Sequence, residues 1–323
     1  MLKAWMKLSM ALALAAGAAS APAAQLSTDA RGAIPHDVQQ LVVIDYRAMQ
    51  NSAAAMDLRN RVMPPELKQF DEALQKSGLN DNHDVDELAF ALFRTKSDSD
   101  SLDTVGIAQG QFDVQSIVAG FKKSKVKATM VRTNSIYPMT KAGMVLCFVD
   151  PSTMVFGEKE AVTKALDARD GISPSLLSNN NMMGAMQSVD SNPLWSILDQ
   201  KGTQTMMTQL LGSAGTEASG GSGADFGTVR NKLVGSWYSM DFQHGVKFDL
   251  TVSTGDAFTA STLSSLMTAA VMVRKMSSTD IEKQALSATS ISSSAGQLTI
   301  DYTSTDNQFS SLLQSPLFGN VVR

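Results

Sequence analysis

An order of strands and helices that occurs twice along the sequence is the feature that most constrains the fold of this chain. Apolar residues at every second position predict strands, and apolar residues at every third or fourth position predict amphipathic helices. In the first half these patterns predict the order β-α-β-β-α-β-β-α over residues 41–46, 52–77, 87–94, 104–112, a helix after Asp113, and residues 127–138, 143–156 and 158–169.

The second half follows the same order after a helical segment at residues 181–188. Its expected elements are residues 194–198, 203–211, 234–242 and 246–254, a helix after Asp256, residues 286–293 and 297–303, and a last helix at residues 306–313. Residue identity between the halves is low, so the match is one of element order. We therefore expect an α+β protein of two similar lobes that arose by internal duplication, with antiparallel-rich sheets and helices on one face of each sheet.

The first 24 residues have the features of a secretory signal peptide in the required order. Lys3 and Lys7 form a charged start, residues 8–19 form an apolar run too short to cross a bilayer, and Ala-Pro-Ala at residues 21–23 forms a small-residue exit. We expect residues 1–24 to be removed, a mature chain that begins near Ala24 or Gln25, and a periplasmic or extracellular location.

The remaining chain is expected to divide into a first lobe at residues 25–172 and a second lobe at residues 173–323. The boundary lies in a polar stretch that contains Pro174. Within the second lobe, residues 212–224 are made of Gly, Ser, Ala, Thr and Glu, with no large apolar side chain. Such a composition is typical of a flexible loop.

Charge and hydropathy argue against two kinds of partner. Removal of residues 1–24 takes away two of the 27 basic residues and none of the 31 acidic ones, which leaves a net charge of −6. Because nucleic-acid-binding proteins present a clustered basic surface, we expect no nucleic-acid partner. No later apolar run approaches the ~20 residues of a membrane-spanning helix, so we expect no transmembrane segment after signal removal.

One cysteine is present, so no internal disulfide can form. Cys147 lies within the apolar run Met-Val-Leu-Cys-Phe-Val at residues 144–149, and this pattern favours a buried, inert thiol in a strand. A reactive thiol would need a nearby base, and no histidine is close to Cys147 in sequence.

The densest group of possible oxygen ligands for a metal ion is Asn80, Asn82, Asp84 and Asp86, at alternating positions of one segment. Calcium prefers this type and spacing of ligand. The match to an EF-hand loop is incomplete, because Val85 replaces the turn glycine and Ala91 replaces the closing glutamate. These four residues are weak metal-site candidates, and a polar turn is the simpler interpretation.

Catalytic patterns are not evident elsewhere in the sequence. His36, His83 and His244 have no metal-ligand spacing, and no Gly-x-Ser-x-Gly motif occurs. We therefore assign no catalytic residue and no cofactor. Nineteen methionines are present, and those at residues 182, 183 and 186 and at 206 and 207 are expected to pack in the core rather than bind copper.

Two segments resemble a family of uncharacterised exported bacterial proteins. Residues 41–94 have a strand that ends at Asp45, a long helix and a second strand, and residues 148–158 have a two-strand turn followed by a helix at residues 161–166. The resemblance covers mainly residues 35–170. It implies an exported protein with this fold and brings no catalytic residues, because the family has no assigned activity.

These observations favour an exported, non-enzymatic protein of the bacterial envelope or extracellular space that binds a partner protein or an apolar ligand. The alternative is a secreted hydrolase whose site is assembled from dispersed polar residues. Smooth sheet faces with an apolar groove would favour the first hypothesis, and a deep pocket with convergent histidine, serine or carboxylate groups would favour the second.

Overall fold

The computed structural model describes residues 25–62, 65–76, 79, 84–94, 102–141, 143–212 and 226–315. Up to Arg169 the chain forms α2 (Thr28–Gly32), β1 (Val38–Asp45), α3 (Tyr46–Gln50), α4 (Ala53–Val62), α5 (Pro65–Lys76), β2 (Val85–Arg94), β3 (Leu102–Gly110), α7 (Val114–Lys123), β4 (Thr129–Val131), β5 (Asn134–Pro138), β6 (Met144–Asp150), β7 (Thr153–Glu158) and α8 (Lys159–Arg169).

The second half begins with a short 3-10 helix and ends with a helix. Its elements are η1 (Leu176–Ser178), α9 (Asn180–Gln187), β8 (Leu194–Leu198), α10 (Gln200–Gly212), α12 (Phe226–Asn231), β9 (Leu233–Asp241), β10 (Val246–Thr254), α13 (Ala257–Ser277), α14 (Asp280–Ser287), β11 (Thr289–Ser294), β12 (Gln297–Ser304) and α15 (Asp306–Leu313).

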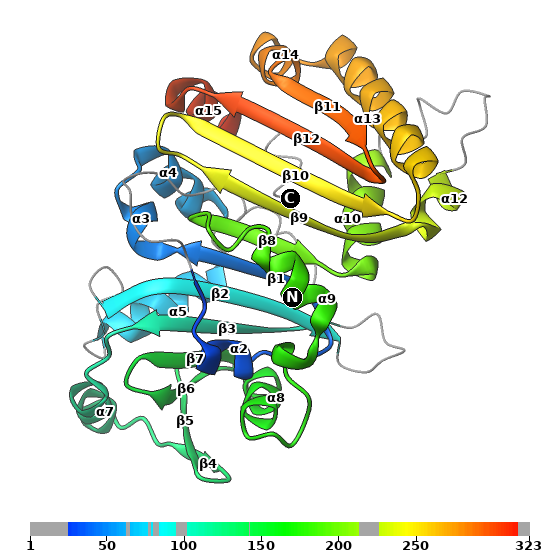
Figure 1. The fold of residues 1–323 in the computed structure, drawn as a ribbon. Helices are drawn as coiled ribbons and strands as arrows, with labels where there is room; N and C mark the ends of the chain where they lie inside the picture. Colours follow the sequence, from blue (N-terminus) through cyan, green and yellow to red (C-terminus); the bar gives the residue numbers. More distant parts are fainter. Residues whose placement is uncertain are drawn as a thin grey trace.

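The strands of the described residues join one twelve-stranded antiparallel sheet in the order β11-β12-β10-β9-β8-β1-β2-β3-β7-β6-β5-β4 (Figure 1). The expected α+β class with an antiparallel sheet and helices is confirmed. The expected lobe boundary near residue 172 separates the strands of one half of the sheet from those of the other. The two halves meet where β1 pairs with β8, with Val43 opposite Trp195, so the sheet is continuous across the boundary.

The two halves of the sheet have the same order of neighbouring strands. Outward from the central pair, the first half runs β1-β2-β3-β7-β6 and the second runs β8-β9-β10-β12-β11. Helices α7 and α13 follow the third strand of each half, and α8 and α15 follow the last hairpin. The short hairpin of β4 and β5 is an addition to the first half.

Several local predictions differ from the structure. The expected strand pair at residues 127–138 and 143–156 consists of two hairpins, because the chain turns at Arg132, which has a φ of 53°, and again between Asp150 and Thr153. Helices α2, α3, α12 and α14 were not predicted, Tyr46 of α3 was expected in a strand, and so was Leu286 of α14. This helix begins with a reciprocal capping box in which Thr279 and Glu282 each bond the other's backbone nitrogen, and this arrangement satisfies two amides at the helix start.

The side chains of each strand alternate between two hydrophobic clusters, one on each face of the sheet. The first face carries Val42 and Ile44 of β1 and extends over both halves of the sheet. Helices α3, α4, α5, α7, α10, α12, α13 and α15 pack on it. The second face carries Leu41 and Val43 of β1 and is covered by α2, η1, α8 and α9.

The helical cover of the second face ends near β9, although the sheet continues beyond it (Figure 1). On β10, β12 and β11 the residues in register on this face are polar, and we call this surface the open face. Its residues are Lys247, Asp249, Thr251, Ser253, Ser290, Ser292, Ser294, Gln297, Thr299, Asp301 and Thr303. A sheet with one apolar and one hydrated face is stable when it is antiparallel, because the face that meets water needs no apolar side chains.

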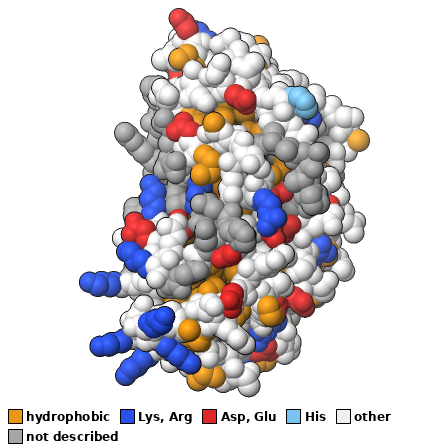
Figure 2. Space-filling view, turned by 90° about the vertical axis from the view of Figure 1, so that its left-hand side faces the viewer, with side chains coloured by type: hydrophobic (Ala, Val, Ile, Leu, Met, Phe, Trp, Pro, Cys, Tyr) orange, Lys and Arg blue, Asp and Glu red, His pale blue; other side chains and the backbone are white. Residues whose placement is uncertain are grey.

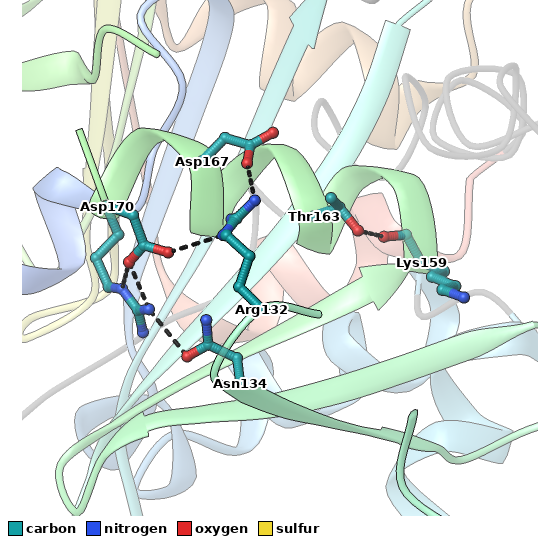
Figure 3. Close-up of polar contacts among 7 residues, drawn as sticks. Arg132, Asn134, Lys159, Thr163, Asp167 and Asp170 are labelled. Atoms are coloured by element: carbon teal, nitrogen blue, oxygen red, sulfur yellow. Dashed lines mark hydrogen bonds and ion pairs between the residues drawn. The ribbon is translucent and has the colours of Figure 1, made fainter. Parts of the chain in front are cut away.

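A network of ion pairs attaches the β4–β5 hairpin to α8 (Figure 3). The Arg132 guanidinium lies 2.5 Å from Asp167 and 3.3 Å from Asp170, while Arg169 donates to Asp170 at 2.6 Å and to Asn134 at 2.9 Å. Burial raises the pKa of Asp170, but the hydrogen bonds and charges of the two arginines outweigh this effect and lower it. The network therefore holds the edge of the sheet against a helix.

Candidate binding groove

A groove with a volume of about 820 Å³ lies where the cover of the second face ends. Its wall is formed by η1 and α9, and its floor by the adjoining ends of β8, β9 and β10. Neutral polar side chains from these elements and from the start of α10 line much of it, among them Ser178, Asn180, Asn181, Ser188, Gln200 and Ser253. The volume is within the ~300–1,000 Å³ that is usual for ligand sites.

The wall is held by a residue that caps one helix and binds a distant loop. Asn179 accepts a hydrogen bond from the Met182 backbone nitrogen at 3.1 Å, which caps α9. Its amide nitrogen donates to the His36 carbonyl oxygen at 3.0 Å. Below this cap, the buried side chains of Met182 and Met186 join the core of the second face, as the sequence analysis predicted. Helix α9 is therefore held at its start by Asn179 and along its inner side by the two methionines, and its outer residues border the groove.

Trp237 is the aromatic side chain of the groove floor. It lies on β9 directly opposite the buried Ile197 of β8 and packs partly against the second-face core. Across the other edge of β9 its register partner is Thr251 on the open face. Trp237 thus lies at the border between the covered and open parts of the sheet, half-buried, with Val234 of the same strand 55% exposed nearby.

The start of α10 supplies the carboxylate of the groove, and this carboxylate already has partners. One oxygen of Asp199 accepts from the Gly202 backbone nitrogen at 2.7 Å, and the other pairs with Arg94 at 2.5 Å. Gln200 donates to the Leu233 carbonyl oxygen at 2.8 Å. Gly202 packs so closely on the Gln39 carbonyl oxygen that an added Cβ would lie 2.6 Å from it, so this position requires glycine.

The ionisable groups that line the described part of the groove have partners. Among the described lining residues, the charge of Asp199 is balanced by Arg94, and the His36 ring nitrogen lies 3.0 Å from its exposed sequence neighbour Asp37. Ser178 donates to the Ser175 carbonyl oxygen rather than to a base. The arrangement offers an aromatic surface with hydroxyl and amide groups around it, which suits a neutral polar ligand.

The candidate metal ligands do not form a described site. Asn80 and Asn82 lie outside the described residues, as does His83. Asp86 pairs with Arg47, and the Asp84 carbonyl oxygen accepts from the Gln111 backbone nitrogen at 2.9 Å. Within the described ranges, no group of three or more histidine, cysteine, aspartate or glutamate residues could hold a metal ion. The Gly and Ser segment also lies outside them, except for Gly212, which ends α10.

Cys147 is buried, as the sequence analysis predicted. Burial raises the pKa of its thiol to about 11, because a thiolate would lose its hydration there. The predicted inertness of this thiol therefore has a physical basis.

Comparisons with known proteins assign no family. No family model matches the chain, and no curated protein matches it. Among solved structures, crystal form I of a protein named TP0453 has a TM-score of 0.49 and 12% identity over 92% of this chain and 97% of that chain. Crystal form III of the same protein has a TM-score of 0.48 and 10% identity over 90% and 99%. In the described parts of this chain, every helix is too short or too polar to span a membrane.

The sequence analysis did not single out Trp237, Asn180 or Asn181. Only the alternation of Trp237 with Tyr238 in an expected strand could have indicated that the two side chains lie on opposite faces. The position of Trp237 beside α9, where the helices that cover the second face of the sheet end, depends on contacts between segments that are distant in the sequence.

Proposed function

We propose that this chain is an exported binding protein that recognises a neutral, hydroxyl-rich ligand, such as an oligosaccharide, in the groove beside Trp237. The observation that carries this proposal is the composition of the groove. It combines one half-buried indole with amide and hydroxyl side chains, and the charge of Asp199 is already balanced by Arg94. A strongly charged ligand would lack an opposite charge there.

The ligand class follows from the groups that each part of the groove offers. The flat face of an indole packs against the apolar C–H face of a sugar ring, and side-chain amides donate and accept hydrogen bonds at once, as hydroxyl groups require. An apolar ligand, which with a partner protein was one of the two partners expected from the sequence, would leave the groups of Asn180, Asn181 and Ser188 without water or partners. A neutral polar ligand avoids that loss.

Export is supported by the expected signal peptide at residues 1–24. The hydrolase alternative needs a nucleophile hydrogen-bonded to a base. In the described part of the groove Ser178 donates to the Ser175 carbonyl oxygen, and the hydrogen bond of the His36 ring goes to Asp37 rather than to a serine. Binding without turnover is therefore the better-supported activity.

The test is a titration of residues 25–323 with a panel of neutral oligosaccharides, with a fatty acid as the apolar comparison. Of the three tryptophans in the sequence, Trp5 lies within residues 1–24, so residues 25–323 contain Trp195, which is fully buried, and Trp237. Binding in the groove should therefore change the fluorescence of Trp237 and protect it from acrylamide quenching.

Matched variants assign the signal to the groove. Trp237→Ala should weaken binding about tenfold or more, which corresponds to 1.4 kcal/mol, while Trp237→Phe retains much of the affinity. Phe258→Ala on α13 removes an aromatic side chain that is 78% exposed and absent from the groove, and it should leave affinity unchanged. Fatty-acid binding without saccharide binding, or equal loss in both alanine variants, would reject the proposal.

A further inference from the structure

Three acidic residues gather where β1 ends and β2 begins. Asp45 is the last residue of β1 and lies opposite Glu87 of β2, and Asp86 precedes Glu87 in the chain. This end of the two strands lies on the side of the molecule that faces the viewer in Figure 2, where acidic and basic side chains both reach the surface. Gathering carboxylates raises the free energy of the folded state unless cations balance them.

Two of these carboxylates have clear partners. Asp86 forms an ion pair with Arg47. Asp45 caps α3 and accepts from the Ala48 backbone nitrogen at 2.7 Å. Glu87 differs, because its Oε2 atom is buried without a hydrogen-bond partner in the described structure. The neighbouring side chain on β3 is Gln109, which carries no charge.

The first described residues dock against this group. The backbone nitrogen of Gln25 donates to Glu87 Oε1 at 3.1 Å, and that of Ser27 donates to Gln109 Oε1 at 3.1 Å. Between them, the Leu26 side chain is 2% exposed and packs into the core of the second face. Residues 25–27 are therefore fixed in position, and the nitrogen atom of Gln25 points at Glu87, which forms no ion pair with a cation among the described residues.

The pKa of Glu87 reflects its burial and the negative charges beside it. Burial raises its pKa from 4.5 to about 7, and the charges of Asp45 and Asp86 add to this effect, although the Gln25 hydrogen bond lowers it. Arg47 is the cation of α3 in this group, and it pairs with Asp86. An additional positive charge at the Gln25 nitrogen would therefore favour the carboxylate form of Glu87.

We propose that Glu87, with Asp45 and Asp86 beside it, is a binding site for the α-ammonium group created when the chain is cleaved before Gln25. Cleavage turns the neutral backbone N–H at this position into a charged group with two or three N–H donors, and one of these donors satisfies Glu87 Oε2. The site therefore distinguishes processed from unprocessed chains. This inference rests on the expected signal peptide and is independent of the ligand groove.

The test compares one protein before and after cleavage. A fusion with a protease site directly before residue 25 supplies both forms. Gln25→Ala is used throughout, because an amino-terminal glutamine cyclises slowly to a neutral lactam, whereas alanine keeps the α-ammonium group for the length of the titration. The Glu87 carboxyl group is titrated by ¹³C NMR and assigned by the loss of its signal in Glu87→Gln. We expect a pKa well above 4.5 in the uncleaved fusion and a decrease of about one unit or more after cleavage. An unchanged pKa would reject the proposal.

Stability against pH gives a second readout. In the uncleaved protein the folded pKa of Glu87 is above the unfolded value, so stability is full below about pH 4.5 and falls as the pH rises towards 7. After cleavage, the melting temperature should fall less between pH 4.5 and pH 7 than it does in the uncleaved protein. The Glu87→Gln variant should show no such difference between the cleaved and uncleaved proteins. The control Glu160→Gln, at an exposed position of α8, should leave the difference intact.

If Glu87→Gln does not fold, acetylation of the new amino terminus replaces it, because it removes the charge without altering a side chain. The acetylated cleaved chain should return to the pKa of the uncleaved fusion. A cleaved, acetylated chain that keeps the lowered pKa would also reject the proposal.

Discussion

The two halves of the sheet have the same strand order but meet water differently. On the second face of the first half, β3 and β7 place Ile107 opposite Val155, and both are completely buried. The corresponding strands of the second half, β10 and β12, place Asp249 opposite Asp301 on the open face. The same backbone arrangement thus supports a covered, apolar face in one half and a hydrated, polar face in the other.

This difference shows that the same strand order forms whether the side chains on the second face are apolar or polar. The first face is apolar in both halves, with Ala108 and Met154 in the first and Leu250 and Ile300 in the second. Burial of that face against helices supplies the driving force that both halves share. The second face is then free to differ, and the groove lies where the covered part gives way to the open part.

The largest expected contrast comes from placing a charge on the second face of each half. Ala91→Lys should destabilise the protein by about 4 kcal/mol or more, because Ala91 is completely buried and the ammonium would have no counterion. Thr251→Lys, on the open face, should change stability by about 0.5 kcal/mol or less. Urea unfolding followed by circular dichroism measures both, and similar losses would show that the open face is covered in solution.

The next contrast uses the same side chain on neighbouring strands. Trp195→Ala should cost about 3–5 kcal/mol, because the indole is completely buried at the junction of the halves. Trp237→Ala should cost less than half of that, since its indole is only half-buried. Equal losses in the same denaturation experiment would contradict the position of Trp237 at the border of the covered region.

A smaller contrast concerns the corresponding helices α7 and α13. Asp113 caps α7 through the Ser116 backbone nitrogen, while Asp256 caps α13 through Thr259 and also pairs with Lys232 at 3.0 Å. Each aspartate-to-alanine change should lower the melting temperature by about 2 °C, with the larger effect at Asp256. The aspartate-to-asparagine variants serve as controls, because asparagine is an equally good cap.

The pH dependence of this effect has a defined sign. The hydrogen bonds of Thr259 and Lys232 lower the pKa of Asp256 from 3.8 to about 2. Its contribution to stability is therefore present above pH 3.8 and is lost as the pH falls towards 2. Wild type and Asp256→Ala should converge in melting temperature over that range, and a constant difference would assign the effect to another cause.

The smallest effect is expected on the open face itself. Burial and the neighbouring carboxylate of Asp249 raise the pKa of Asp301, although Lys247 opposes this. Asp249→Asn should bring the pKa of Asp301 closer to 3.8, because a like charge is removed. Carboxyl ¹³C titration measures this shift, and an unchanged pKa would mean that the two side chains point apart.

The shared strand order also bears on the history of the chain. An origin by internal duplication stays a prediction, because the low residue identity between the halves does not test it. The extra hairpin of β4 and β5 in the first half and helix α14 in the second half would then be later changes to one unit.

The sequence by itself determined most of the strands, several of the helices and many of the residues that these elements bury. Hydrophobic periodicity predicted β8 with its observed bounds, and the caps at Asp113 and Asp256 were predicted from side chains that bond backbone atoms three residues away. The burial of Cys147 followed from the apolar run around it. These features depend on neighbours in the chain, so a local pattern is sufficient to predict them.

The tertiary structure alone decided how these elements are joined. The pairing of β1 with β8, the position of Trp237 beside α9 and the contact of Gln25 with Glu87 link segments that are far apart in the sequence. No periodicity records which strand edge pairs with which, because many pairings satisfy the same alternation of polar and apolar residues. The groove and the amino-terminal site arise from those long-range choices, whereas α9 and the strands β1, β2, β8, β9 and β10 were predicted from the sequence.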